Sequence, residues 1–376
     1  MQKERSIIRS LARCCWLLAW LMLPGLCHAQ ARVFTNGSEG YACYRIPAIV
    51  RTSHGTLLAF SEARRNTCED FGDVRIVMRS SNDEGRTWSR LSVVAENGAM
   101  QAGNPAPVVD LTDERYPHGR ILMVYCTGDA SEDAVMRGKG TRRVWVRSSA
   151  DEGATWSAPS EITASVKLPG WRHYATGPGH ALQLTLGPHK GRIFVAANHS
   201  EGEPQPQGHD YAAHGFYSDD HGATWRLSQT IDYPGSNEST SAQATTGEVV
   251  MNMRDQSKQS RARILSFSKD GGATWDKTVV ANDLPDPVCE GSMIADGKRL
   301  LFSNPGNKTA RRDLTLSVSE DGGHTWPKHT LVEPGPAAYS DIVLLPHHNL
   351  GLLWERGNDG GIFFATVPLH TILSAR

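Results

Sequence analysis

The chain has 376 residues, of which 39% are hydrophobic, and its 39 Lys and Arg nearly balance its 40 Asp and Glu, for a formal net charge of −1. This length and hydrophobic content suit a large globular core, in one all-β unit or in two domains. The balanced charge argues against nucleic acid as the main partner, because binding phosphates requires a surplus of Lys and Arg on one face. The 36 Gly and 20 Pro residues indicate many turns.

The first 29 residues are typical of a secretory signal peptide. A basic start precedes an apolar run over residues 15–26, and the small residue Ala29 marks the expected cleavage point. The apolar run is shorter than the roughly 20 residues that span a membrane, which disfavours a membrane anchor. A lipid-modified Cys27 is an alternative, although the residues before it make a poor lipidation signal. We therefore expect residues 30–376 to form the functional domain of a secreted, periplasmic or cell-surface protein.

Without residues 1–29 the chain keeps four cysteines, an even number in an oxidising compartment. Cys43 and Cys68 flank one predicted hairpin and could pair, whereas Cys126 and Cys289 are expected to be buried thiols. The sequence alone does not fix the connectivity of the four.

Runs of alternating apolar and polar residues predict short β-strands along the chain, and no stretch keeps the 3.6-residue period of a long helix. We expect these strands to form four-stranded antiparallel sheets. In chain order the predicted strands cover residues 44–51, 56–62, 73–81, 86–95, 120–126, 141–149, 181–186, 192–197, 215–218, 249–253, 263–268, 299–302 and 314–319.

One eight-residue pattern, Ser-x-Asp-x-Gly-x-Thr-Trp, occurs five times, and we call each copy a box. The boxes begin at Ser81, Ser149, Ser218, Ser268 and Ser319. Repetition of this kind indicates a repeat architecture. The Ser and Asp side chains can accept hydrogen bonds from turn amides, Gly can adopt a left-handed conformation, and Trp can pack beneath the sheet. We expect hairpin turns rather than calcium sites, because the copies share one carboxylate and calcium takes 6 to 8 oxygen ligands.

The predicted fold is all-β, a six-bladed β-propeller of four-stranded antiparallel sheets. The roughly 350 residues after the leader, divided by a blade of about 50 to 60 residues, give six blades, within the usual range of 4 to 8. Five boxes mark five blades, and the sixth is expected over residues 340–368, closed by a strand from the N-terminal region. Separate small domains and a β-helix are the alternatives, and the uneven insertions between boxes disfavour a β-helix.

The boxes cannot form an active site, because five equivalent turns lack the single asymmetric pocket that catalysis needs. Four arginine-bearing segments interrupt the repeat, each beside a predicted strand: Tyr44-Arg45-Ile46-Pro47, residues 60–64, residues 252–254 and residues 311–314. In a propeller the equivalent strands of successive blades face the central axis, so these arginines could converge there. Guanidinium groups bind a carboxylate through two parallel hydrogen bonds and stay charged at any working pH.

The segment Tyr44-Arg45-Ile46-Pro47, followed by five such boxes, resembles the sialidase (neuraminidase) family over essentially the whole chain after the leader. The resemblance implies a six-bladed propeller that removes terminal sialic acids from glycans, with no metal and no other cofactor. It also implies a triad that holds the sugar carboxylate, formed by Arg45, Arg254 and Arg311. Arg312, adjacent to Arg311, remains an alternative for the third position.

The same resemblance implies a proton donor. Arg64 and, six residues later, Asp70 resemble the family's second-blade arginine and its acid/base aspartate. Asp73 is the alternative, but it opens a predicted strand, whereas Asp70 lies in the preceding loop, where it could overhang a substrate. Asp70 is expected to protonate the leaving oxygen and later to activate water.

Tyr339 resembles the family's nucleophile, Glu238 the glutamate that polarises it, and Glu355 the glutamate that orients Arg45. A neutral phenol suits this role, because the anomeric carbon of a sialic acid already bears a carboxylate that would repel an anionic nucleophile. Free Tyr has a pKa of about 10 and is a weak nucleophile, so Glu238 would serve as its base. The resemblance thus implies net retention through a covalent sialyl-tyrosine.

The sequence therefore predicts a secreted exo-alpha-sialidase that acts on sialylated glycoproteins, glycolipids or oligosaccharides, with no nucleic-acid partner and no stable membrane span. Asn104 and Asn198 are weaker candidates for the pocket wall. Two alternatives remain open. A trans-sialidase, including an intramolecular one, would use the same residues with another acceptor, and a non-catalytic propeller would bind glycans without chemistry.

Overall fold

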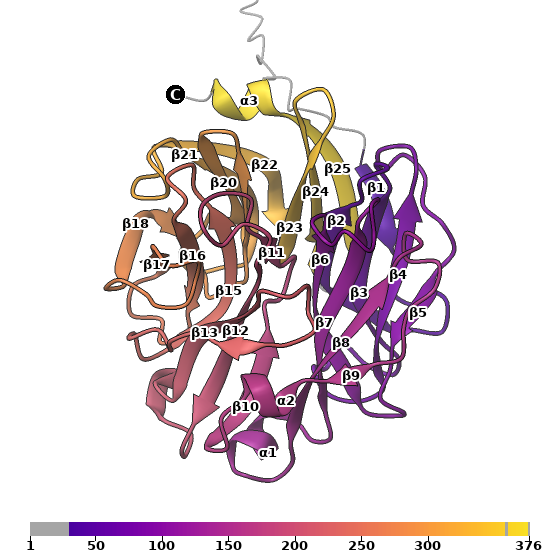
Figure 1. Cartoon of the computed structure of the whole chain (residues 1–376), viewed down its shortest axis with the longest axis vertical. Coiled ribbons are helices and arrows are strands. Elements are labelled where there is room, and N and C mark those ends of the chain that lie inside the picture. The colour runs from indigo at the N-terminus through magenta and orange to yellow at the C-terminus, as the bar shows by residue number, and fades with distance from the viewer. Residues whose placement is uncertain (1–29, 358–359, 375–376) are drawn as a thin grey trace, which may run out of the picture.

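The chain forms an all-β propeller of four-stranded antiparallel sheets in a computed structural model that describes residues 30–357 and 360–374 (Figure 1). The predicted signal peptide, residues 1–29, lies outside the described residues. The sheets follow one another around a common centre, and an edge strand of each antiparallel run lies innermost (Figure 1). Within the described part of the chain, no helix is long and apolar enough to cross a membrane.

Hydrogen bonds group the described strands into five sheets. The largest contains β2 (Cys43–Arg51), β3 (Leu57–Arg64), β4 (Val74–Ser81), β5 (Ser92–Ala95), β6 (Gln101–Asp110), β7 (Arg120–Gly128), β8 (Arg142–Ser149) and β9 (Ser160–Glu161). The second contains β10 (Trp171–Thr176), β11 (Leu182–Gln183), β12 (Ile193–Glu201), β13 (Tyr211–Ser218) and β14 (Arg226–Leu227).

The other three sheets have four strands each. One contains β15 (Ser236–Gln243), β16 (Val249–Asp255), β17 (Ala262–Ser268) and β18 (Val279–Pro285), and the next β19 (Ser292–Asp296), β20 (Arg299–Pro305), β21 (Arg312–Ser319) and β22 (Lys328–Pro336). The last joins β1 (Gln30–Phe34) to β23 (Ser340–Leu345), β24 (Asn349–Glu355) and β25 (Ile362–Pro368). The described helices are short: α1 (Glu132–Met136), α2 (Thr163–Val166), α3 (Leu369–Leu373) and the 3₁₀ turn Pro206–Gly208.

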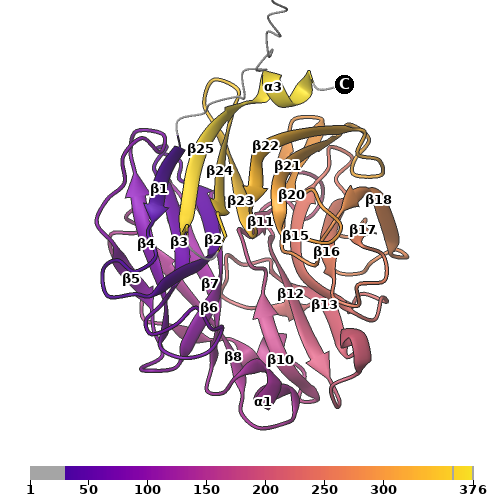
Figure 2. The same cartoon turned by 180° about the vertical axis from the view of Figure 1, so that it is seen from behind.

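The sequence predicted six separate sheets, whereas the hydrogen bonds give five. A single parallel bridge between Val74 of β4 and Gln101 of β6 joins two otherwise antiparallel runs, β2 to β5 and β6 to β9, into one sheet. Ring closure agrees with the prediction, because β1 pairs with β25 and completes the last sheet (Figure 2). The first and last parts of the described chain thus share one sheet.

Two predicted strands are wrong in extent, and several innermost strands were not predicted at all. The strand expected over 86–95 begins only at Ser92, because the residues before it complete a box turn, and the strand expected over 181–186 is reduced to β11. The innermost strands that were not predicted are β6, β10, β15 and β19. In β15, whose sequence is SNESTSAQ, every residue is buried. Alternation of apolar and polar residues marks a strand with one solvent-exposed face. Because β15 is buried on both faces, its sequence does not show this alternation.

Each of the five boxes lies at the hairpin between the third and fourth strands of an antiparallel run, counted within each half of the eight-stranded sheet. In every box the Ser hydroxyl donates to the Asp Oδ1 at 2.8 Å. The same Oδ1 accepts from the Thr amide at 2.8–3.0 Å, and the Gly amide donates to the Ser Oγ at 2.7–2.9 Å. The aspartate makes its hydrogen bonds inside the turn, in agreement with the predicted hairpin role.

The Trp residues of the boxes also contribute to the packing between neighbouring antiparallel runs. Four of the box Trp residues pack on apolar clusters that join their own sheet to the preceding one, and Trp156 packs on the cluster between the two halves of the eight-stranded sheet. Trp88, for example, meets Phe364 of the last sheet edge to face, with ring centroids 5.4 Å apart. Gly85 and Gly272 have φ near +90°, and a Cβ there would lie 2.1 Å from Phe364 and 2.5 Å from Phe194. The box therefore needs glycine for both conformation and space.

We expect Asp151→Ala to destabilise the protein by about 1–3 kcal/mol, because it removes the acceptor of the Thr155 amide and of the Thr155 and Ser149 hydroxyls. The pKa of Asp151 is lowered, mainly by its hydrogen bonds to Thr155 outweighing burial. The stabilisation is therefore fully present above the ordinary carboxyl pKa of about 4 and is lost as the pH falls below it. Urea unfolding at pH 7 and at pH 3 measures both effects. The exposed Asp232→Ala is the control, and equal unfolding midpoints for the two variants would contradict the hairpin role.

Candidate active site

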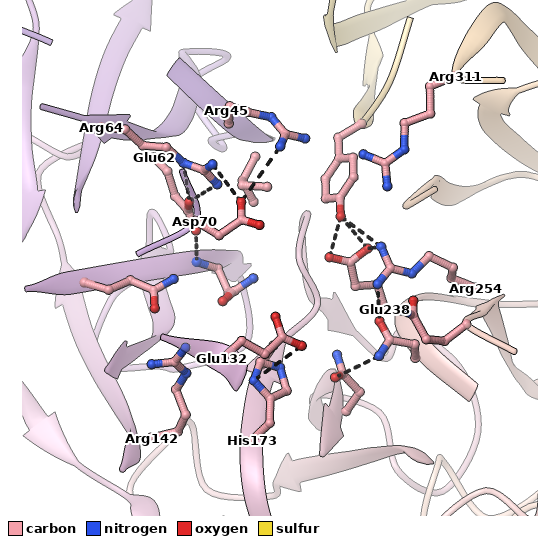
Figure 3. A pocket seen from close by; sticks show the side chains of 18 residues that line it. Arg45, Glu62, Arg64, Asp70, Glu132, Arg142, His173, Glu238, Arg254 and Arg311 are labelled. Carbon is pink, nitrogen blue, oxygen red and sulfur yellow. Dashed lines mark hydrogen bonds and ion pairs between the residues drawn. The ribbon is translucent and has the colours of Figure 1, made fainter. Parts of the chain in front are cut away.

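The innermost strands surround a polar cavity of about 280 Å³ (Figure 3). No box residue lines this cavity. Seven of the eight site residues predicted from the sequence line it: Arg45, Arg64, Asp70, Glu238, Arg254, Arg311 and Tyr339. The eighth, Glu355, lies behind Arg45 and is buried.

β-Bulges in four innermost strands lie at the wall of this cavity. The register slips in β2, β6, β10 and β15, and the slipped segments contain Ile46, Asn104, His173 and Glu238, all of which line the cavity. Ile46 has a φ of 59° and Asn104 one of 54°, and both precede a proline. A bulge re-aims a side chain at a point where regular pairing would not. A positive φ is uncommon for a β-branched residue, so the Ile46 conformation requires support from its surroundings.

Glu355 supplies that support from the last sheet. Its carboxylate accepts hydrogen bonds from Arg45 Nε at 3.1 Å, from Arg45 Nη2 at 2.9 Å and from the Ile46 amide at 2.8 Å. The Glu355 carboxylate raises the pKa of Arg45, against the opposing effect of burial. Glu355 thus fixes the bulge in β2 and the direction of the Arg45 guanidinium together.

Arg64 holds the loop that carries Asp70. Its Nη1 donates to the Cys68 carbonyl at 2.6 Å and lies 2.7 Å from Asp70 Oδ1, and its Nη2 pairs with Glu62 at 2.8 Å. Cys68 is also bonded to Cys43 at the start of β2, so the predicted disulfide is present. The described thiols of the two remaining cysteines are buried, as expected. The loop is therefore anchored to β2 through the disulfide and to β3 through Arg64.

Asp70 stands at the mouth of the cavity with 73% of its side chain exposed. Burial of the carboxyl would raise its pKa, but the charges of Arg64 and Arg45 outweigh burial, so the pKa of Asp70 lies below its ordinary value. Asp73, the alternative, pairs instead with Arg65 and Arg75 and does not line the cavity. Asp70 is therefore an anion at neutral pH.

Tyr339 precedes β23 and points its hydroxyl at Glu238. The phenol donates toward both Glu238 oxygens at 2.7 Å, and Arg254 Nη1 donates to the phenol oxygen at 3.0 Å. Arg254 also pairs with Glu238 at 2.5 Å and donates to Asn237 Oδ1 at 2.6 Å. Burial and the Glu238 carboxylate raise the pKa of Tyr339 well above its usual value, although two arginines oppose the effect. The phenol is therefore neutral, with a carboxylate placed to take its proton.

Arg311 enters the cavity from the loop before β21. Its guanidinium lies over the Tyr339 ring, 5.3 Å from the centroid, and donates to the Val288 carbonyl at 2.9 Å. The Arg45 guanidinium lies over the same ring at 5.2 Å. Arg312 instead pairs with Asp313 and does not line the cavity. Of the two arginines that the sequence left open, the structure places Arg311 at the cavity.

Sequence reasoning missed the wall across the cavity from Arg45 and Arg311 (Figure 3). Glu132 of α1, Arg142 and His173 lie there, and His173 Nδ1 is 3.9 Å from Glu132 Oε1. Burial lowers the pKa of His173 to about 4. These residues belong to no motif, so the sequence offered no signal for them. The weaker candidates Asn104 and Asn198 both line the cavity. Asn104, like Ile46, immediately precedes a proline.

One group of possible metal ligands lies outside the cavity, among the described residues. Asp110, Asp113 and His221 place one ligand atom each within 4.8 Å of one another. Arg120 lies 3.2 Å from Asp113 and 3.7 Å from Asp110, and Arg115 pairs with Asp113 at 2.8 Å. These carboxylates already have cationic partners, so the group does not fit a divalent cation.

Residues 55–352 match the BNR repeat-like domain family. The chain is 33% identical to a sialidase of Micromonospora viridifaciens over 91% of its own length and 54% of the relative's. It is 30% identical to an exo-alpha-sialidase of Aspergillus fumigatus, over 75% of this chain and 69% of that one. The chain belongs to the sialidase family. It spans only about half to two thirds of the first curated sialidases that it matches, including one of Bacteroides fragilis at 64%.

Solved sialidase structures share the fold. The Hadza microbial sialidase Hz136 superposes with a TM-score of 0.80 at 28% identity, over 91% of this chain and 69% of that one. The intramolecular trans-sialidase of Ruminococcus gnavus superposes with a TM-score of 0.72 at 17% identity, over 91% of this chain and 98% of that one. The second likeness concerns the fold alone. The sialidase family predicted from the sequence is thus confirmed.

We expect Glu355→Gln to destabilise the protein by about 1–3 kcal/mol, because it removes the anionic partner of the mostly buried Arg45 and weakens the support of the bulge. Urea unfolding at neutral pH measures the change. Glu114→Gln, on an exposed residue, removes the same charge elsewhere. If the two variants unfold at the same urea concentration, Glu355 does not hold this part of the ring.

Proposed function

We propose that the protein is an exo-alpha-sialidase, which hydrolyses terminal sialic acids from glycoproteins, glycolipids or oligosaccharides. The observation that carries this proposal is the contact of Tyr339 with Glu238 and Arg254, beneath guanidinium groups that face the same cavity. A neutral phenol with a carboxylate base is the nucleophile that an anionic anomeric centre needs. The family membership supports the same reaction.

In this proposal Arg45, Arg254 and Arg311 hold the carboxylate of the sugar. Arg45 and Arg254 are paired with Glu355 and Glu238, whereas Arg311 has no ion pair among the described residues. A substrate carboxylate would supply the missing anion. Planar guanidinium groups bind carboxylates through paired hydrogen bonds and so fix the sugar's orientation over Tyr339.

Asp70 would act as the general acid at the mouth of the cavity. Arg64 and Arg45 lower the pKa of this carboxyl in the empty site. The sugar carboxylate would offset the charge of Arg45 and so raise the pKa of Asp70 when substrate is bound. A protonated Asp70 can then donate to the leaving oxygen, and its carboxylate can activate water in the second step.

The reaction proceeds by two displacements at the anomeric carbon. In the first, the Tyr339 oxygen forms a bond to this carbon, Glu238 accepts the phenol proton, and the aglycone leaves with the proton of Asp70. In the second, Asp70 takes a proton from water, the water oxygen bonds to the carbon as the bond from the carbon to the Tyr339 oxygen breaks, and this oxygen recovers its proton from Glu238. Two inversions give net retention.

The cellular compartment and the number of blades are also proposals. We propose that residues 1–29 are a secretory signal peptide, and the Cys43–Cys68 disulfide supports an oxidising compartment, where such bonds persist. We also propose that the eight-stranded sheet acts as two blades, because one bridge joins its two antiparallel halves, which would give six blades in all.

We expect Tyr339→Phe to lower the release of free sialic acid from sialyl-lactose by at least about 100-fold, because it removes the nucleophilic oxygen. Tyr125→Phe removes a buried hydroxyl outside the cavity and is the matched control. Thermal unfolding confirms that both variants are folded. An inert wild-type protein would favour the non-catalytic alternative, and release of an anhydro sugar would favour the intramolecular trans-sialidase.

Asp70→Ala is expected to distinguish substrates by their leaving groups. Release from sialyl-lactose, whose leaving alcohol needs a proton, should fall by about 10²- to 10⁴-fold. Release from an aryl sialoside should fall much less, because a phenolate leaves without full protonation. Asp73→Ala is the matched control on the neighbouring carboxyl. Equal losses for both substrates would contradict the role of Asp70 as an acid.

A further inference from the structure

A second hollow, of about 380 Å³, adjoins the cavity, and no carboxylate lines it. We call it the basic groove. Its lining residues are Arg254, Gln256, Lys258, Arg261, Pro287, Val288, Thr309 and Arg311. Arg254, Gln256 and Arg311 line the cavity as well, so the groove is continuous with the proposed active site.

Two of the groove's side-chain cations are free of ion pairs within the described part of the chain. Lys258 and Arg261 are exposed and take part in no ion pair among the described residues. Their loop is nevertheless held in place, because Asp255 accepts hydrogen bonds from the Ser257 amide at 2.9 Å and from the Ser260 amide at 2.8 Å. The groove thus presents two positive charges from a fixed loop.

The acidic residues beside the groove do not neutralise it. Asp255 and Asp286 are both 2% exposed. Asp255 is occupied by the amides of its own loop, and Asp286 accepts from the Val288 amide at 2.8 Å and pairs with the buried Arg263 at 3.3 Å. Buried carboxylates with these partners leave the surface above them positive.

The position of the groove indicates which part of a substrate reaches it. Arg311 lies both over the Tyr339 ring and in the groove wall. Figure 3 shows Arg254 and Arg311 approaching from the side opposite Arg64 and Asp70. A sugar seated over Tyr339 would occupy the triad with its own carboxylate. In the proposed reaction the leaving oxygen on its anomeric carbon lies beside Asp70, so an aglycone that extends from this oxygen past Arg311 would meet the two free cations.

We propose that the basic groove is a binding site for the aglycone, and that Lys258 and Arg261 select aglycones carrying an anionic substituent, a sulfate or a carboxylate. This inference rests on the proposed sialidase activity and adds the chemical class of the preferred substrate. Lys258 and Arg261 are specificity residues and touch no reacting atom. A sulfated galactose and a second, internal sialic acid both supply the required anion.

The test compares three substrates: sialyl-lactose, sialyl-lactose with a 6-sulfate on galactose, and disialyl-lactose. The kcat/KM for release of free sialic acid is measured for the wild type and for Lys258→Gln/Arg261→Gln at low and at high salt. Lys277→Gln/Lys298→Gln, which removes two exposed charges outside both hollows, is the matched control. We expect the wild type to prefer an anionic substrate by about 3- to 30-fold at low salt.

The groove variant should lose this preference, measured as the ratio of kcat/KM between the anionic substrates and sialyl-lactose, whereas the control should keep the wild-type ratio. High salt should reduce the wild-type preference, because the charges are exposed. Preference for only the sulfated or only the disialylated substrate identifies the source of the anion. No preference in the wild type, or an unchanged preference in the groove variant, overturns the inference.

Failure of the proposed activity gives a different result. If the wild type releases nothing from any of the three substrates, the sialidase proposal fails. Calorimetric titration with lactose 6′-sulfate and with lactose then tests the groove directly. Binding of the sulfated sugar alone, lost in Lys258→Gln/Arg261→Gln, supports the inference, and absence of binding overturns it.

Discussion

One carboxylate joins the closure of the ring to the geometry of the site. Glu355, on the last sheet, accepts hydrogen bonds from the Arg45 side chain and from the Ile46 amide in the first sheet. Asp341 makes a parallel connection nearby, accepting from the Ile49 amide at 2.8 Å and from Ser292 Oγ at 2.5 Å. Where the two ends of the propeller meet, buried charge therefore holds the strands that carry the site, and loss of either carboxylate would affect fold and site together.

The propeller separates buried apolar contacts between its sheets from polar side chains along its central axis. Between neighbouring sheets the contacts are apolar, and each box Trp completes one of these clusters. Toward the axis the strands carry buried Ser, Asn and Glu, most evidently in β15. A buried polar group is costly unless it is hydrogen-bonded, and the bulges bring these groups to partners across strands. Stability thus comes mainly from the apolar clusters between the sheets, and the residues along the axis can serve binding and catalysis.

Charge in the candidate site is nearly balanced, and Arg311, unlike the arginines that pair with glutamates, has no ion pair among the described residues. Glu355, Glu62 and Glu238 pair with Arg45, Arg64 and Arg254, while Arg311 has only a carbonyl partner among the described residues. The paired arginines are held rigid before any substrate arrives, which reduces the entropy lost on binding. The unpaired arginine favours an anionic ligand, and the basic groove extends the same preference beyond the cavity.

The sequence by itself determined the repeat, the four-stranded sheets, the role of the boxes and most of the candidate site. Local rules sufficed for the repeat, the sheets and the boxes, since turn chemistry and alternation depend on neighbouring residues, whereas the candidate site came from the resemblance to the sialidase family. Only the tertiary structure showed that Arg311 and Asp70 line the cavity and that Arg312 and Asp73 do not, because the alternatives differ in which distant side chains they meet. It also revealed the wall formed around Glu132 and the innermost strands such as β15, whose burial comes from neighbours far away in the chain.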